Sequence, residues 1–396
     1  MKTKFILAVI LVLMIMISNP NADQSAPVKL SLGNRTDVMN VYAYPNNCNR
    51  VCYIPQTLEE TVSHYLSQSV NRDGFPDAEV EVACDDSCTV ILPGTLPSAY
   101  PIRIKDFFDT GLKAFGNASK INQDKKWQYG WRFFLPVGLP LLNHRSVQLL
   151  HFPPDYTLEE KQDYLDSKTS SRWESLLEAN GIPASEVALY EAIIDISPIA
   201  APSDAGSSLG NTYDYFVPYV RNMLNFLLPV DSKDSNTRPL VAYGSPVRKW
   251  VKNEFNITDF KVNTAVPLKL SEQKKIPALG ANHPSFIWYA VEDWCHKSDE
   301  KSHAWALRVM EQDMISACWQ AKMAENRDAD IHKTLDSCTD YWESRPFDIC
   351  MRLETKVCEK TEEDAKKICN SSPKRKISSE DAGKLENVAP MDKFLR

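Results

Sequence analysis

Short apolar runs alternate with segments of helical periodicity through the middle of the chain. Strands that alternate with helices in this way predict a parallel sheet with helices on its faces. We therefore expect an α/β core with three layers over residues 102–295. The predicted strands are Val147 to Phe152, Tyr190 to Ile196, Pro239 to Tyr243 and the run that begins at Ile276, and the predicted helices are Leu158 to Asn180, Tyr213 to Leu228 and Val247 to Phe255.

A different pattern flanks this core on each side. Residues 27–100 predict a small α+β module with a strand at Val38 to Tyr44, a helix at Thr57 to Val70 and a hairpin. Residues 296–370 are rich in Trp and Cys and predict a helical region. The polar residues 371–396 predict a disordered tail.

The N-terminus has the pattern of a secretory signal peptide over residues 1–22. Lys2 and Lys4 precede an apolar run from Phe5 to Ile17, which is shorter than the roughly 20 residues of a membrane span. We expect an exported protein, periplasmic or secreted, with no integral membrane span after cleavage. A retained anchor is the alternative.

Cysteine usage agrees with export, because the chain has an even number, ten, all after the signal segment. Cys84 and Cys88 flank an Asp-Asp-Ser turn between two alternating strands, which predicts a disulfide across a hairpin. Cys48 and Cys52 form a second local pair. We interpret the other cysteines as links between helices: Cys295, Cys318, Cys338, Cys350, Cys358 and Cys369.

Zinc is the alternative for Cys295-His296 with His303 and His332. Their spacing matches no standard ligand set, so a disulfide is the simpler interpretation of Cys295 and no metal is expected. The 13 glycines form neither GxGxxG nor GxxxxGKS, so the sequence predicts no phosphate loop and no cofactor. The net charge of -7 argues against a surface that coats nucleic acid, although a local basic groove remains compatible with it.

Polar residues follow three of the predicted strands. In an α/β sheet, ligands bind at the carboxyl ends of the strands. We therefore take the residues at these strand ends as candidate site residues: Asp195 and Ser197, Gly244 and Ser245, and Asn282, His283 and Ser285.

From Tyr190 to Trp294 the chain resembles the uracil-DNA glycosylase superfamily. The resemblance is carried by PLVAYGSPVRKW, a strand that runs into a helix start, and by LGANHPSF, a strand that ends in His-Pro-Ser. It implies that His283 stabilises charge on the departing base, that Ser285 contacts phosphate, and that Asp195 stands where the family often has a base-reading Asn. The water-positioning residue would be Asp155, in HFPPDY.

The resemblance implies a glycosylase-type hydrolase that binds nucleic acid or a nucleotide. One alternative is a non-enzymatic exported protein that binds an envelope or host protein, with His283 serving only as a hydrogen-bonded residue beside a proline turn. A third is a serine hydrolase, because Gly206 to Gly210 fits the GxSxG pattern with Ser208 as nucleophile.

Overall fold

The computed structural model describes 14 stretches of the chain. They are residues 27–34, 41–42, 58–84, 87–110, 133–134, 141–152, 168–190, 192–198, 213–228, 238–272, 274–287, 295, 300–326 and 328–371. The predicted signal segment, the Cys48/Cys52 pair, Asp155, Ser208 and the predicted tail after Ser371 lie outside these residues.

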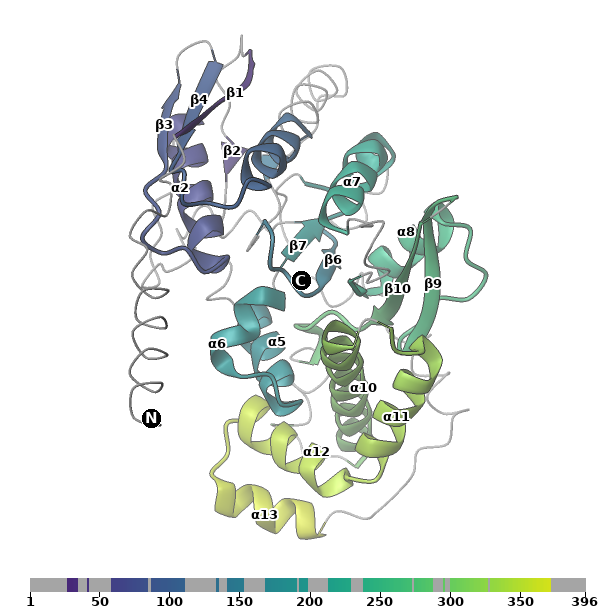
Figure 1. Ribbon diagram of the computed structural model, residues 1–396. Coiled ribbons are helices and arrows are strands. Elements are labelled where there is room, and N and C mark those ends of the chain that lie inside the picture. The colour runs from purple at the N-terminus through teal and green to yellow at the C-terminus, as the bar shows by residue number, and fades with distance from the viewer. Residues whose placement is uncertain are drawn as a thin grey trace, which may run out of the picture.

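The centre of the fold is a five-stranded sheet in the order β7-β6-β8-β10-β9 (Figure 1). Neighbours among the first four strands run parallel, and β9 pairs antiparallel with β10. The α/β class predicted from the sequence is confirmed at this level. The strands are β6 (Val147–Leu150), β7 (Ala192–Asp195), β8 (Leu240–Tyr243), β9 (Thr264–Ser271) and β10 (Lys274–Ala281).

Successive strand residues contribute to two separate hydrophobic clusters, because side chains alternate between the faces of a strand. Ala242 belongs to the first cluster, together with buried residues of α7 (Tyr213–Leu227) and α8 (Ser245–Glu254). Val241 and Tyr243 belong to the second, together with α5 (Lys168–Ala179) and α10 (Glu300–Glu325). The sheet is therefore covered by helices on both faces.

The first unit of the chain packs on the α7 side. It consists of α2 (Leu58–Arg72) and a three-stranded antiparallel sheet in the order β1-β4-β3: β1 (Val28–Asn34), β4 (Ser87–Leu92) and β3 (Glu81–Cys84). Cys84 and Cys88 are joined as predicted, with their Cα atoms 4.1 Å apart. Tyr65 and Leu66 of α2 belong to the same cluster as the α7 face of the central sheet.

Asp73 attaches this first unit to the segment that enters β6. Its carboxyl group accepts hydrogen bonds from the backbone N–H groups of Leu141 and Asn143, each at 2.8 Å, and from the Tyr100 hydroxyl. Buried backbone donors need such partners, because an unsatisfied one costs about 1–3 kcal/mol. One carboxyl group therefore fixes the start of a central strand.

Disulfides connect the C-terminal helices, as the sequence predicted. Cys318–Cys338 joins α10 to α11 (Ile331–Glu343), and Cys350–Cys369 joins α12 (Pro346–Arg352) to α13 (Glu362–Ser371). Cys295–Cys358 confirms the interpretation of Cys295 as a disulfide half.

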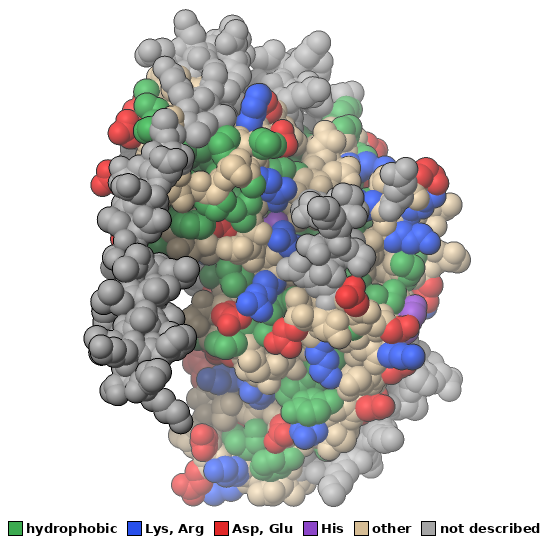
Figure 2. Space-filling model, in the orientation of Figure 1, with side chains coloured by type: hydrophobic (Ala, Val, Ile, Leu, Met, Phe, Trp, Pro, Cys, Tyr) green, Lys and Arg blue, Asp and Glu red, His purple; other side chains and the backbone are tan. Residues whose placement is uncertain are grey.

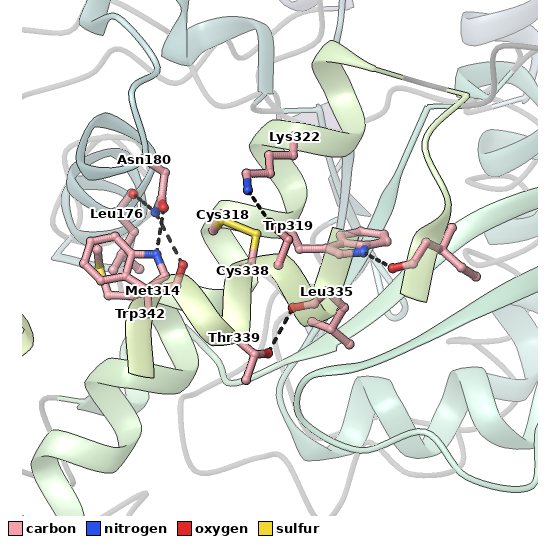
Figure 3. Close-up of a disulfide and its surroundings, with 12 residues drawn as sticks. Leu176, Asn180, Met314, Cys318, Trp319, Lys322, Leu335, Cys338, Thr339 and Trp342 are labelled. Atoms are coloured by element: carbon pink, nitrogen blue, oxygen red, sulfur yellow. Dashed lines mark hydrogen bonds between the residues drawn. A yellow bond between two sulfur atoms is a disulfide. The ribbon is translucent and has the colours of Figure 1, made fainter. Parts of the chain in front are cut away.

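Hydrogen bonds around Cys318–Cys338 tie this region to the central domain (Figure 3). The Trp342 indole donates to the side chain of Asn180, directly after α5, at 3.0 Å. Trp319 of α10 is fully buried, and its indole donates to the carbonyl of Ile331 at 3.0 Å. The helical region is therefore part of the layer that covers the second face of the sheet.

The other predicted helices and strands agree in outline with the structure where it describes them. The helix from Leu158 is described only from Lys168, and Gly181, at φ 91°, ends it as a C-terminal glycine. Of the strand predicted at Val38 to Tyr44, the structure describes β2 (Val41–Tyr42), which pairs with β5 (Phe133–Phe134). Strand β9 was not predicted. None of the described helices has the length and apolar content of a membrane span.

Candidate active site at the carboxyl edge of the sheet

The carboxyl ends of β6, β7, β8 and β10 lie along one edge of the sheet, because these strands are parallel. Leu150 is in register with Asp195, and Tyr243 with Ala281. The chain passes from β6 outward to β7 and then crosses back to β8, so the connections change direction between β6 and β8. Ligands of doubly wound sheets bind at such a switch point.

His283 lies two residues beyond the end of β10, and its hydrogen bonds fix its tautomer. The backbone N–H of Ser285 donates to Nδ1 at 3.2 Å, and Ser285 Oγ lies 2.6 Å from the same atom. A backbone amide can only donate, so Nδ1 must be an acceptor and the proton of the neutral ring is on Nε2. Burial lowers the pKa of His283 to about 4, so the ring is neutral at pH 7. The site therefore has a neutral N–H donor.

Gly244 lies next to the His283 side chain. Its φ of 85° and ψ of 158° belong to a region that only glycine adopts readily. A Cβ atom at this position would lie 3.5 Å from Cβ of His283. The Gly244 N–H donates to the carbonyl of Ala281 at 2.9 Å, so the turn into α8 is fastened to the end of β10. Glycine is required here by the backbone conformation, since the added Cβ would make only an ordinary van der Waals contact.

His151 is a second histidine at this edge, and the sequence analysis did not select it. It directly follows β6, and its Nε2 is hydrogen-bonded to the hydroxyl of Tyr213, the first residue of α7. Burial and the nearby His283 lower the pKa of His151 to about 3. The sequence predicted a strand that runs to Phe152, whereas β6 ends at Leu150, so the position of His151 at the strand end is visible only in the structure.

Asp195 is the last residue of β7 and is partly buried. Burial raises the pKa of this carboxyl group to about 8, so it carries a proton at pH 7. A protonated carboxyl group has one O–H donor and one carbonyl acceptor. Asp195, His151 and His283 are therefore all uncharged near neutral pH.

Asn282 is directed to α10 rather than left free. Its amide nitrogen donates to Gln312 at 3.1 Å and to Asp313 at 3.2 Å. Asp313 also forms a buried ion pair with Arg172 of α5, with N and O atoms 3.0 Å apart. Burial raises the pKa of Asp313 to about 6, while the Arg172 charge lowers it. This network holds the turn that carries His283 against the helices of the second face.

The structure thus brings most of the sequence-predicted residues to one edge. Ser197 is fully buried, and its backbone N–H donates to the carbonyl of His151 at 3.0 Å. Ser245 is exposed at the first position of α8. Asp155 and Ser208 lie outside the described residues, so the roles assigned to them stay predictions.

A separate buried group lies among the C-terminal helices. Ligand atoms of His303, Cys350 and Glu354 lie within 4.8 Å of one another, as a metal site would require. The sulfur of Cys350 is bonded to Cys369, however, and metals bind the free thiolate. In this oxidised state the group lacks its sulfur ligand.

No known family model matches this chain, and no curated protein matches it. Figure 2 shows basic and acidic side chains interspersed over the visible face of the molecule, in keeping with the modest net charge of -7. Interpretation of the site therefore depends on its own geometry, in particular on the neutral donor at His283.

Proposed function

We propose that this protein is an exported hydrolase that cleaves an N-glycosidic bond, similar to the uracil-DNA glycosylases, and that it binds nucleic acid or a nucleotide. The observation that carries the proposal is the neutral His283 ring at the carboxyl edge of the sheet, with Nδ1 occupied by the backbone N–H of Ser285. This arrangement leaves Nε2–H to donate to a ligand.

Such a donor suits the cleavage of an N-glycosidic bond. As the bond between C1′ and the base nitrogen breaks, its electron pair moves onto the base and the sugar becomes oxocarbenium-like. Water then supplies hydroxide to C1′, and its second proton leaves with the base or solvent. A preorganised donor that faces the base stabilises the charge that develops there. In a nucleic acid, the base must first be rotated out of the stack to reach it.

Asp195 suits the recognition of the base. With a proton at pH 7, its carboxyl group offers a donor and an acceptor side by side, the same pair that an Asn amide offers. The imide edge of uracil has the complementary N–H and carbonyl oxygen. Aspartate in place of the family's asparagine is therefore compatible with base reading below its pKa.

The test is release of free base from single-stranded DNA that contains uracil or hypoxanthine. We expect His283→Ala to slow release by about 10²–10³-fold, the usual effect of removing one preorganised donor. His332→Ala, on an exposed face of α11, is the matched control and should leave the rate unchanged. Equal rates for the wild type and His283→Ala would refute the role of His283.

Export is supported by two observations of different kinds. The sequence begins with two lysines and an apolar run, and the described residues contain four disulfides. Structural disulfides form and persist in oxidising compartments.

A non-enzymatic binding protein is the second candidate. It is favoured by two exposed aromatic side chains near the junction of α11 and α12, Tyr341 and Phe347, which are 44% and 42% exposed. Aromatic residues are enriched in protein interfaces. This function predicts no base release from the wild type.

A further inference from the structure

The segment that follows α8 contains the triplet Asn256-Ile257-Thr258. An Asn-x-Ser/Thr triplet in an exported protein is an acceptor for N-linked glycan when it lies on the surface. Asn256 and Thr258 are both exposed, and Ile257 between them is partly buried against the first hydrophobic cluster. The two residues that an acceptor site needs therefore face solvent while the middle residue anchors the segment.

The backbone of this turn fixes the conformation of Asn256. The Ile257 N–H donates to the carbonyl of Lys252 at 2.9 Å, and the Asn256 N–H points to the carbonyl of Asn253 at 3.4 Å. This pair of contacts is the Schellman motif that ends many helices, and it places Asn256 in the left-handed region, at φ 51°. Among the described residues, no hydrogen bond is found to the side-chain amide of Asn256.

We propose that Asn256 is an N-glycosylation site of the exported protein. The amide Nδ2 would attack C1 of a sugar carried on a lipid pyrophosphate. A bond forms between Nδ2 and C1, the bond from C1 to the phosphate oxygen breaks, and the lipid pyrophosphate leaves with the electron pair while the amide loses one proton. A membrane-bound oligosaccharyltransferase of the secretory route would catalyse this step.

A glycan at Asn256 is compatible with a ligand at the sheet edge. Helix α8 begins next to Gly244, beneath His283, and runs for ten residues to Glu254. At 1.5 Å per residue this separates its ends by about 15 Å. The glycan would leave beyond Glu254, at the end of α8 that is remote from Gly244. The inference depends on export and not on the proposed hydrolase activity, so the two can fail separately.

Other triplets of this type are less well defined. They begin at Asn34, Asn117 and Asn370, and each includes residues outside the described parts of the chain. Asn370 also directly follows Cys369, which is joined to Cys350. Asn256 is the triplet for which all three residues are described.

The experiment is site-specific peptide mapping of the full chain secreted from eukaryotic cells, before and after treatment with peptide-N-glycosidase. We expect the Asn256 peptide to carry glycan, and the enzyme to convert Asn256 to Asp. Asn256→Gly, which retains the left-handed turn, and Thr258→Val, which keeps Asn256, should each lose the mass of one glycan. Asn253→Gln, an exposed asparagine outside any such triplet, should keep it.

Two results would overturn the proposal. One is an unmodified Asn256 peptide from secreted, disulfide-bonded protein. The other is a glycan at Asn256 that persists in Thr258→Val, because modification that ignores the hydroxyl would not be acceptor-triplet chemistry. Because Thr258→Val leaves the turn residue in place, a folding failure of Asn256→Gly would still leave the proposal testable.

Discussion

Replacement of Asp195 by Asn should stabilise the protein at alkaline pH and have little effect at acid pH. Burial raises the pKa of Asp195 from 3.8 to about 8. Between these two values the folded protein holds a proton that the unfolded chain has released. Since stability falls with pH wherever the folded state binds more protons, Asp195 destabilises the fold progressively over this window and fully above about pH 8.

The size of the effect follows from the pKa difference. About four pKa units at about 1.4 kcal/mol each give an upper bound of about 6 kcal/mol. Asp195 is partly exposed, and solvent screening reduces the interaction of such a group. We therefore expect Asp195→Asn to gain about 2 kcal/mol above pH 8, because an amide has no charge to desolvate.

Urea denaturation near pH 5 and near pH 9 measures this difference. The free energy of unfolding of the variant should exceed that of the wild type by more at the higher pH. Asp77→Asn, at an exposed position, controls for the change in net charge. A difference between variant and wild type that stays constant from about pH 5 to about pH 9 would show that the pKa of Asp195 is not raised in the folded protein.

Two further predictions concern the contacts that hold the C-terminal helices. Arg172→Met leaves the buried Asp313 carboxylate without its partner and should lower the free energy of unfolding, measured in urea, by about 3–5 kcal/mol. The double variant Arg172→Met with Asp313→Leu should lower it much less. Equal losses in the two variants would contradict a buried ion pair. Replacement of Cys295 and Cys358 by Ser removes a disulfide that closes a loop of 63 residues, and it should lower the free energy of unfolding by about 4 kcal/mol. Removal of the short hairpin disulfide between β3 and β4 should lower it by about 2 kcal/mol. The opposite order in thermal denaturation would contradict an origin in loop entropy.

Much of the central sheet could be predicted because its strands are short apolar runs separated by helical segments. The run Pro239 to Tyr243 became β8, and the Asp-Asp-Ser turn correctly indicated the Cys84–Cys88 disulfide. Strand β9 was missed although its burial alternates, because Pro267 interrupts its apolar pattern and three of its eight residues are polar. Antiparallel hydrogen bonds to β10 hold β9 at the edge of the sheet. This pairing is visible only in the tertiary structure.

The candidate site was predicted in part for a similar physical reason. Strand ends can be read from the sequence, so Asp195, Gly244 and His283 were selected. Which of these side chains face one another depends on strand order, which the sequence does not encode locally. His151 was read as part of a strand, and its contact with Tyr213 comes from a residue 62 positions away. The partners of the six cysteines in the C-terminal region could not be predicted either, because spacing alone leaves many pairings open.

We infer that the His283 ring is neutral and that its proton is on Nε2. A two-bond ¹H–¹⁵N correlation spectrum of histidine-labelled protein, with His283→Gln to assign the signals, measures this directly. We predict one pyrrole-type nitrogen at Nε2, one unprotonated nitrogen at Nδ1 and no titration between about pH 5 and about pH 8. A proton on Nδ1, or a titration near the ordinary histidine pKa of about 6.5, would contradict the account.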